Sequence, residues 1–338
     1  MLFSVVIAVR NEKDYISRCL QGVFSQDANE NYEVIVVDGM SNDGTFEQLN
    51  ELKKKYKFSL VKNNKINAAA GRNLGIQKAK GEIIVFIDGD AIPSNDWLKQ
   101  IKNAFKKKDN SIAGVGGPDL IPGDSTDKER AIGIVMTSSL ARGGRFNPST
   151  QHSLLDEERF VEHIPTCNLA LKKDVIGKVG LFDEEFVKGQ DLELNYRIIK
   201  AGYRLFYTPK IRVVHYRKNH IREFARQVFK WAKAKVAIIR KHGFSGLTSH
   251  AYIWPVYFIF LFLVGFAFFY LLNIIEVFII LLFFGIIFYS SVIIFESSRL
   301  SDNFSDKKLF LYSVFLFPII HFSYGFGILN ALLKRKIW

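Results

Sequence analysis

The apolar positions of this chain follow two patterns, and the change between them falls at about residue 243. Before it, short apolar runs rich in β-branched residues alternate with segments of helical periodicity. After about residue 251, long apolar runs contain few polar residues. The first pattern predicts alternating strands and helices, and the second predicts helices that lie in a membrane.

The N-terminal pattern predicts an α/β fold with a mostly parallel sheet. Its apolar runs are continuous rather than alternating, which is typical of strands covered by helices on both faces. In such sheets the ligand binds at the carboxyl ends of the strands. The expected strands are Ser4–Val9, Glu33–Val37, Phe58–Val61 and Glu82–Ile87, and the expected helices are Lys13–Ser25, Gly44–Tyr56 and Asn67–Lys80.

Polar residues follow three of these strands directly. The first strand is followed by Arg10-Asn11-Glu12, the second begins its turn at Asp38-Gly39, and the fourth is followed by Asp88-Gly89-Asp90. No GxGxxG follows the first strand, and no P-loop pattern occurs in the chain. Dinucleotide and P-loop chemistry are therefore disfavoured.

The carboxylate pair Asp88 and Asp90 predicts a metal site. Two carboxylates two residues apart repel each other unless a cation lies between them. Mg²⁺ or Mn²⁺ takes oxygen ligands and leaves positions for substrate phosphates, and Gly89 allows the backbone to approach closely. The alternative is a capping role for a helix expected around Asn95–Lys107, for which Ser94 is better placed.

Three apolar runs, 252–272, 277–295 and 309–333, each come close to the roughly 20 residues that cross a bilayer. None of them contains Asp, Glu, Lys or Arg. The short link Asn273–Glu276 makes the first two runs a hairpin. The sequence therefore predicts a multi-pass region over 251–333 and a location in the cell membrane.

The formal net charge of +13 is concentrated just before these runs. Between Arg212 and Lys241, ten Lys and Arg residues stand against one acid, Glu223. Such a segment is attracted to anionic lipid headgroups by roughly 1 kcal/mol per residue, and the adjoining membrane segments argue against nucleic-acid binding. Residues 219–243 also have apolar positions at helical spacing, which fits a helix in the membrane interface or one packed on the soluble domain.

The charges determine the orientation of the membrane region only in part. Arg240 and Lys241 precede the first run and indicate a cytosolic N-terminal domain. Three full crossings then place Lys334–Lys336 outside, against the positive-inside tendency. Pro318 and Gly327 allow the last run to bend or re-enter, so both topologies stay open.

Four segments together resemble the family 2 glycosyltransferases of the GT-A fold. They are SVVIAVRNE (4–12), EVIVVDGMSNDGT (33–45), AGRNLGI with KGEIIVFIDGDA (70–91) and GLFDEEFVKGQDLELNYRIIKAGYRL (180–205). The resemblance covers about residues 3–240 and implies a Rossmann-like GT-A domain, similar to that of exopolysaccharide enzymes. It divides the chain into a cytosolic catalytic domain (1–218), an amphipathic basic interface helix (219–243) and a transmembrane region (251–333).

The resemblance implies a donor site for a nucleotide-diphosphate sugar. Asp38 is expected to bind the base, and Glu12 is expected near the ribose. Arg72 and Asn73 are expected near the nucleotide. Asp88 is expected in this donor site as well as in the metal site.

The catalytic and metal-binding residues implied by the resemblance come from the later motifs. Asp88 and Asp90 match the metal-binding DxD motif, with Mg²⁺ or Mn²⁺ as the cofactor. Asp191 matches the catalytic aspartate of the family, although Gln190 stands where Glu is usual. His215 ends a late strand and is either a third metal ligand or a partner of a phosphate or of the backbone.

The acceptor side draws on two further segments. Asn168 lies in the segment TCNLAL, and Gln190 directly precedes the expected base. Gln227, Lys230 and Trp231 resemble the QxxRW motif of membrane polysaccharide synthases, with Lys in place of the bidentate Arg. Trp231 either stacks on an acceptor sugar or faces lipid.

Together these residues predict an inverting hexosyltransferase. Asp191 takes the proton of an acceptor hydroxyl as that hydroxyl attacks the anomeric carbon. The expected acceptor is a polyprenyl phosphate or pyrophosphate saccharide at the cytosolic membrane face. Two alternatives stay open: a polyprenyl-phosphate monosaccharide synthase, whose phosphate acceptor has no proton to lose, and a catalytically silent membrane scaffold that binds nucleotide sugar.

Overall fold

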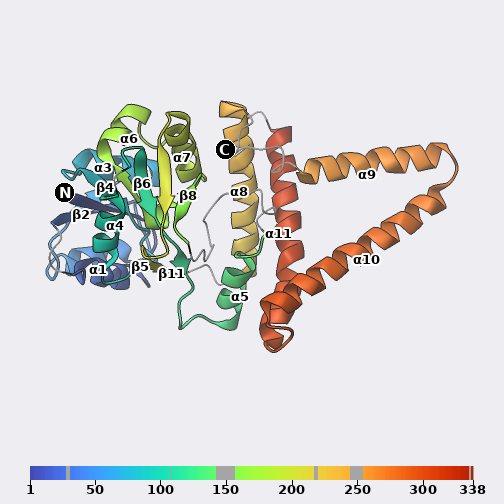
Figure 1. Ribbon diagram of the computed structural model, residues 1–338, viewed down its shortest axis with the longest axis horizontal. Helices are drawn as coiled ribbons and strands as arrows, with labels where there is room; N and C mark the ends of the chain where they lie inside the picture. Colours follow the sequence, from blue (N-terminus) through green and yellow to red (C-terminus); the bar gives the residue numbers. More distant parts are fainter. Residues whose placement is uncertain are drawn as a thin grey trace. The chain divides into compact units, whose positions relative to one another are not determined.

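A computed structural model describes residues 1–27, 31–107, 109–141, 157–216, 220–243, 254–334 and 336–337. The contacts divide the chain into two compact units. The first unit takes its residues from 1–124 and 148–217, and the second takes them from 125–147 and 218–337. Figure 1 shows the helices and strands of both units.

The first unit is an α/β domain built on a mostly parallel sheet, as predicted. Eight strands in the order β3-β2-β1-β4-β9-β6-β10-β8 form the main sheet, and β5-β11-β7 form a second, small sheet. In the main sheet, β9 runs antiparallel to both of its neighbours and β8 runs antiparallel to β10. The strands are β1 (Phe3–Val9), β2 (Tyr32–Asp38), β3 (Ser59–Lys62), β4 (Ile83–Phe86), β5 (Ala91–Pro93), β6 (Ile112–Gly116), β7 (Asp119–Leu120), β8 (Arg159–Val161), β9 (Leu169–Lys172), β10 (Arg204–Tyr207) and β11 (Val213–His215).

The strands and helices expected in the first ninety residues are all present, with shifted ends. Helix α1 starts later than Lys13 because the backbone amides of Tyr15 and Ile16 bond to the carbonyl of Glu12 and form a turn first. The helices of this unit are α1 (Ile16–Phe24), α2 (Thr45–Leu52), α3 (Ala68–Lys78), α4 (Trp97–Phe105), η1 (Thr166–Asn168), α6 (Lys173–Val179) and α7 (Gln190–Lys200).

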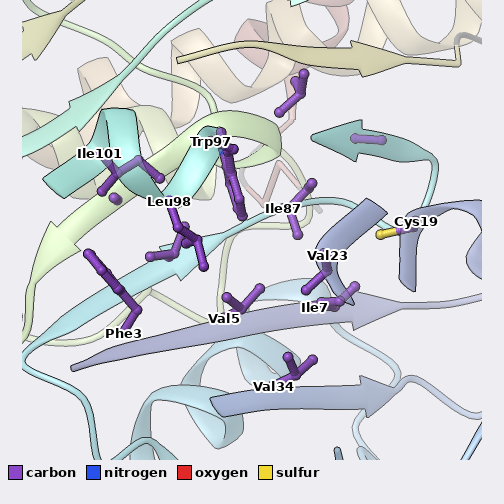
Figure 2. Close-up of a cluster of buried hydrophobic side chains, with 14 of the residues drawn as sticks. Phe3, Val5, Ile7, Cys19, Val23, Val34, Ile87, Trp97, Leu98 and Ile101 are labelled. Atoms are coloured by element: carbon purple, nitrogen blue, oxygen red, sulfur yellow. The ribbon is translucent and has the colours of Figure 1, made fainter. Parts of the chain in front are cut away.

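Helices cover both faces of the main sheet, and β1 shows how the residues divide between them. Phe3, Val5 and Ile7 pack in one core, whereas Val6 packs in the other, because successive side chains of a strand point to opposite faces. Figure 2 shows the first core, in which these side chains lie with Trp97 and others from α1 and α4. The sheet is therefore buried on both faces, as the continuous apolar runs predicted.

The second unit is helical. It contains α5 (Asp127–Val135), α8 (Ile221–His242), α9 (Trp254–Leu271), α10 (Ile275–Leu300) and α11 (Lys307–Leu333). Helices α10 and α11 are long and apolar enough to cross a membrane, with 26 and 27 residues. Helix α9 is apolar and has 18 residues. The three predicted runs are thus helices, although residues 252 and 253 of the first lie outside the described residues.

The predicted interface helix corresponds to α8, apart from residue 219, which lies outside the described residues. Phe224 and Val228 of α8 pack with Leu316 and Ile320 of α11. Further along the same pair of helices, Ala232 and Val236 pack with Ile328 and Ala331. The predicted apolar face of α8 is therefore covered by another helix of its own unit.

One segment departs from the expected domain boundary at residue 218. Residues 125–147 belong to the second unit, although they lie within the range expected for the catalytic domain. Their helix α5 places Ala131, Ile132 and Val135 in the apolar cluster that α8 and α11 form. A helix this short has no membrane signature in the sequence, so only its contacts reveal where it belongs.

Candidate active site

The donor-side residues Glu12 and Asp38 lie at the carboxyl ends of adjacent strands. Strands β1 and β2 are parallel and pair Val9 with Asp38, so the residues after β1 start beside Asp38. The backbone N–H of Glu12 donates to Thr45 Oγ1 at 2.9 Å, which holds the turn after β1. Both residues are therefore at the edge of the sheet where the sequence predicted them.

Asp38 has one carboxylate oxygen satisfied and one without a partner. The side chain is buried, and Oδ2 accepts a hydrogen bond from the Ser41 N–H at 3.1 Å. Oδ1 is buried and has no hydrogen-bond partner among the residues that the structure describes. Because an unsatisfied buried acceptor is costly, this oxygen fits a donor group supplied by a ligand.

Arg72 lies against the metal-binding motif. It comes from α3, and its Nη2 lies 3.1 Å from Asp88 Oδ1. The guanidinium group is mostly buried and lies over the ring of Phe182, with 5.8 Å between Cζ and the ring centroid. A fixed cation beside Asp88 suits a site for a diphosphate.

The side-chain amide of Asn73 bonds within the protein. Its Nδ2 donates to the Phe182 carbonyl at 2.9 Å and to Glu184 Oε1 at 3.1 Å. Its Oδ1 accepts from the Phe182 N–H at 2.9 Å. The amide thus holds the segment around Phe182, and the expected place of Asn73 near the nucleotide stays a prediction.

The small second sheet brings His215 to the DxD motif. Strands β5 and β11 are antiparallel and pair Ala91 with His215, and the Tyr216 N–H donates to the Asp90 carbonyl at 2.9 Å. His215 Nε2 lies 3.2 Å from Asp90 Oδ1. Ligand atoms of Asp88, Asp90 and His215 all lie within 4.8 Å of one another. The three predicted metal-binding residues therefore converge.

The donor set fits a hard divalent cation. Two carboxylates and one imidazole suit Mg²⁺ or Mn²⁺ and leave coordination positions for phosphate oxygens. A Cβ at Gly89 would lie 2.7 Å from Val9 Cγ1, so the turn between the two carboxylates has room only for glycine. The close packing of Gly89 therefore fixes the turn that carries Asp88 and Asp90.

A second possible cluster shares His215 and is less suited to a metal. Asp119, Cys167 and His215 also offer ligand atoms within 4.8 Å of one another. Burial raises the pKa of the Cys167 thiol to about 12. Sulfur is also a soft ligand, which suits Mg²⁺ or Mn²⁺ less than a carboxylate does. Burial also lowers the pKa of His215, but the carboxylates of Asp90 and Asp119 outweigh it and hold that pKa well above its usual range.

Asp191 stands at the start of α7, where the sequence placed the catalytic base. Gly189 precedes the helix with a φ of 77°, a conformation that favours glycine. The Leu192 N–H donates to Asp191 Oδ1 at 2.9 Å, and His163 Nε2 lies 4.0 Å from Asp191 Oδ2. The side chain of Asp191 is 21% exposed, so it remains accessible to a substrate.

Gln190 is buried and holds the loop before α7. Its Nε2 donates to the carbonyls of Phe186 and Val187 at 2.9 and 3.0 Å. The amide donors are therefore used within the protein. The acceptor contact expected of Gln190 stays a prediction.

Asn168 is likewise structural and not an acceptor-binding residue. It is 1% exposed, and its Oδ1 accepts from Trp97 Nε1 at 2.9 Å. Its Nδ2 donates to the carbonyls of Pro118 and Ile211 at 3.1 and 2.8 Å. A buried side chain whose donors and acceptor are all engaged cannot also bind a sugar.

The three residues of the QxxRW-like segment lie on α8, in the second unit. Trp231 is partly buried against the apolar cluster that contains Phe224 and Val228. Its indole therefore contacts other helices of that unit. The acceptor contacts expected of Gln227 and Lys230 stay predictions.

Sequence reasoning missed two residues of the site, Asp119 and His163. Asp119 Oδ2 lies 3.4 Å from His215 Nδ1 because β7 and β11 are neighbours. His163 is buried beside Asp191. Neither residue belongs to a motif, and each lies far in sequence from its partner. The local sequence therefore does not identify them.

Residues 4–178 match the family described as Glycosyl transferase family 2. The chain belongs to this family and is a glycosyltransferase. It is 32% identical over 267 residues to a protein of Methanococcus voltae named "Dolichyl N-acetyl-alpha-D-glucosaminyl phosphate 3-beta-D-2,3-diacetamido-2,3-dideoxy-beta-D-glucuronosyltransferase", covering 77% of this chain and 79% of that one. It is 29% identical to "Glycosyltransferase AglE" of Haloferax volcanii, over 62% of this chain and 64% of that one.

Solved structures confirm the GT-A-like fold. A mannosyltransferase from Pyrobaculum calidifontis in complex with GDP-Man and Mn²⁺ has a TM-score of 0.61 at 16% identity, covering 99% of this chain and 88% of that one. GalNAc-T7 with UDP, GalNAc and Mn²⁺ has a TM-score of 0.50 at 19% identity, covering 73% and 52%. Both neighbours contain a divalent metal, so this fold accommodates one.

Proposed function

We propose that this protein is a metal-dependent, inverting glycosyltransferase that moves a sugar from a nucleotide-diphosphate sugar to the hydroxyl of a lipid-linked saccharide at the cytosolic membrane face. The observation that carries the proposal is the convergence of Asp88, Asp90 and His215, with ligand atoms within 4.8 Å of one another, at the carboxyl edge of the sheet. Arg72 adds a mostly buried cation 3.1 Å from Asp88.

The donor is held by residues of three elements. Asp38 Oδ1, a buried acceptor without a partner, accepts a hydrogen bond from the nucleobase, and Glu12 lies by the ribose. Asp88, Asp90 and His215 would hold Mg²⁺ or Mn²⁺, which would neutralise charge on the diphosphate. Arg72 donates to the phosphate oxygens from the other side of Asp88.

Asp191 acts as the general base of a single displacement. The acceptor oxygen attacks the anomeric carbon, the bond from that carbon to the diphosphate oxygen breaks, and the hydroxyl proton passes to the Asp191 carboxylate. The nucleoside diphosphate leaves with the electron pair. Because attack and departure take place on opposite faces of the sugar, the anomeric configuration inverts.

The lipid-linked acceptor is supported by two features. The name of the Methanococcus voltae relative describes an acceptor sugar that is already attached to dolichyl phosphate. The second unit of this chain carries apolar helices long enough to cross a membrane. An acceptor hydroxyl on such a saccharide has the proton for which a base is needed.

Sugar transfer into isolated membrane lipids tests the proposal. Full-length protein is incubated with each of several radiolabelled nucleotide sugars and with lipid extracts, and the lipid products are separated and treated with mild acid. The proposal expects label on a lipid-linked saccharide and none on free polyprenyl phosphate. Label on polyprenyl phosphate alone identifies a monosaccharide synthase, and donor binding without any labelled lipid identifies a scaffold.

The variant Asp191→Asn separates the two transfer reactions. A hydroxyl acceptor needs a base, whereas a phosphate acceptor does not. Loss of transfer with retained donor binding therefore supports the hydroxyl acceptor, and full transfer by the variant contradicts it.

A further inference from the structure

The second unit pairs a cationic helix with an apolar one over nearly their whole length. Figure 1 shows α8 and α11 side by side. Phe224 near the start of α8 packs in one cluster with Leu316, and Ala232 and Val236 pack further along with Ala331. At the far end, Arg240 donates to the carbonyls of Ala331, Leu332 and Lys334 at 2.8, 3.1 and 2.9 Å. The two helices therefore lie side by side and run in the same direction, with their C-terminal ends together.

Close contact along this pair depends on Gly327. A Cβ at Gly327 would lie 2.5 Å from the Phe229 carbonyl oxygen and 2.8 Å from Ala232 Cβ. The axis of α11 thus comes near the backbone of α8. The pair behaves as one element, and any position assigned to α11 in a membrane applies to α8 as well.

A full crossing by α11 is incompatible with this partner. Helix α8 carries seven Lys and Arg residues, and Lys230, Lys233 and Lys235 lie in its middle. If α11 crossed the bilayer, these three ammonium groups would be brought to the depth of the hydrocarbon core. Charged side chains there are strongly unfavourable, and lysines at mid-helix are too far from either surface to reach water.

The uncovered side of α11 is nevertheless apolar. Its face toward α8, α5 and α10 is buried, whereas five large side chains at spacings of four and seven residues form an exposed stripe on the other face. These side chains are Leu311, Phe315, Phe322, Phe326 and Leu333, with exposed fractions of 56, 64, 62, 62 and 87%. A stripe of this kind, backed by a cationic helix, fits the boundary between lipid headgroups and acyl chains.

The start of α11 is tied to a segment that is continuous with the first unit. Arg130 of α5 pairs with Asp306, and Lys308 lies 2.7 Å from Asp127. Helix α5 follows Asp124 of the first unit after two residues, so it cannot be separated from the catalytic domain by a bilayer. The first residues of α11 therefore lie on the side of the membrane that holds the catalytic domain.

We infer that α11 lies flat in the membrane surface with its exposed stripe in lipid, and that only α9 and α10 cross the bilayer. Helix α9 has 18 residues and α10 has 26, so each reaches the length of a crossing. Two crossings return the chain to its starting side. Lys334 and Lys336 are then on the side of the catalytic domain, in agreement with the positive-inside tendency that three crossings violate.

Single cysteines and a membrane-impermeant maleimide test this topology in the full chain. Cys19 and Cys167 are buried, so the unchanged protein is the background control. The variants are Leu272→Cys at the α9–α10 turn, Ser305→Cys before α11 and Lys336→Cys after it. The inference expects Ser305→Cys and Lys336→Cys to react from the same face of sealed vesicles and Leu272→Cys from the other. Reaction of the first two from opposite faces, or of all three from one face, overturns it.

Depth along α11 gives a second, independent readout. Spin labels are placed at Leu311→Cys, Phe322→Cys and Leu333→Cys, and their accessibility to oxygen and to a polar relaxation agent is compared in reconstituted vesicles. A flat helix gives three similar, shallow depths. A crossing helix puts the label at position 322 in the bilayer centre and the other two near the surfaces, which contradicts the inference.

A different observation concerns His163, and it rests on the proposed role of Asp191 as base. The Asn195 Nδ2 atom lies 2.8 Å from the Ile164 carbonyl and 2.9 Å from His163 Nδ1. A carbonyl only accepts, so this amide must be oriented with its NH₂ group toward both partners. His163 Nδ1 therefore accepts, and the neutral ring carries its proton on Nε2, the atom that lies 4.0 Å from Asp191 Oδ2.

The geometry points to His163 as a positioning residue for Asp191. The Leu192 N–H already holds Oδ1 at 2.9 Å. At 4.0 Å the Nε2–H of His163 is too far from Oδ2 for a hydrogen bond. Catalytic contacts are often long before substrate binds, and a small approach brings this N–H into bonding distance. The Leu192 N–H and the His163 Nε2–H together limit the rotation of the Asp191 carboxylate. The carboxylate therefore keeps one orientation toward the acceptor hydroxyl.

Two amide variants separate this role from a merely structural one. In His163→Gln the side-chain amide reaches the position of Nε2, whereas in His163→Asn it reaches only that of Nδ1. The inference expects His163→Asn to lower kcat about 10–100-fold and His163→Gln to keep most of it, with unchanged donor binding and closely matched thermal unfolding. Equal kcat values for the two variants contradict it. Asp191→Asn is assayed in parallel, because normal turnover in that variant refutes the base itself and not only its positioning.

Discussion

The two units of this chain place their apolar and polar residues in opposite ways. In the first unit, large apolar side chains such as Trp97 are fully buried, and charged groups gather at the carboxyl edge of the sheet. In the second unit, Phe288 and Phe295 of α10 are each 72% exposed. Polar groups there lie between helices, as in the hydrogen bond between Tyr289 and His321 at 2.9 Å.

The difference is what two solvents require, because the second unit contains candidate membrane helices and the described part of the first does not. In water, burial of apolar surface drives folding, and charges stay where a ligand can reach them. In lipid, exposed apolar surface costs nothing, and polar groups contribute by bonding to each other. The same side chains thus act as core in one unit and as surface in the other, and each prediction below tests one side of this contrast.

The largest expected effect is the loss of the metal-binding carboxylates. Asp90→Asn removes the carboxylate that lies 3.2 Å from His215, so sugar transfer should fall below detection while the protein still folds. Excess EDTA should do the same to the unchanged protein, and added Mn²⁺ or Mg²⁺ should restore it. Transfer rates are measured together with circular dichroism, and full activity in EDTA would refute the metal requirement.

Removal of the base is the next largest effect. Asp191→Asn should lower kcat about 10²–10⁴-fold, the usual contribution of a general base, with nucleotide-sugar binding nearly unchanged. Calorimetry for the donor and turnover of the same variant are compared. If the variant binds donor weakly but turns over normally at saturation, Asp191 belongs to the donor site instead.

A buried amide in the first unit should affect stability and not chemistry. Asn168→Ala leaves the Trp97 N–H and the carbonyls of Pro118 and Ile211 without their partner, and each unsatisfied buried group costs about 1–3 kcal/mol. The melting temperature should fall, whereas KM for the acceptor should stay the same in the folded fraction. A raised acceptor KM at unchanged stability would restore the acceptor role that the buried geometry argues against.

The exposed side chain of Arg240 in the second unit makes as many hydrogen bonds as Asn168, but its loss should reduce stability less. Arg240 also bonds to three carbonyls, but it lies at the solvent-exposed end of α8, where water replaces lost partners. Arg240→Ala should therefore lower the free energy of unfolding by only about 0.5–1.5 kcal/mol. Thermal unfolding of both variants in the same detergent makes the comparison. A larger loss for Arg240→Ala than for Asn168→Ala would show that the contrast between the two units is wrong.

Sequence patterns predicted those parts of the site that depend on short stretches of chain. The residues after β1, β2 and β4 lie at one edge because parallel strands share a direction, and the pattern of buried strands is visible locally. Asp88 and Asp90 were predicted in this way. Asp191 and His215 were predicted from the resemblance to the family, and the roles of all four residues stay predictions.

Residues whose contacts depend on the fold are harder to interpret from the sequence. The amides of Asn73 and Asn168 bond to carbonyls far away in the chain, and that of Gln190 bonds to the carbonyls of Phe186 and Val187. Polarity alone cannot separate an amide that faces a ligand from one that faces a buried carbonyl. Asp119 was missed because its partner, His215, lies 96 positions away in the chain.

For this protein, the sequence by itself determined the α/β class, the family, the carboxylates of the site and the presence of apolar helices, because each is encoded in local periodicity or in short motifs. The tertiary structure decided that residues 125–147 join the helical unit, that α8 and α11 form one aligned pair, and that His163 lies behind Asp191. The physical reason is that these are contacts between distant segments. Hydropathy describes how much of a helix is apolar, whereas the partner on its other face decides where in a membrane that helix can lie.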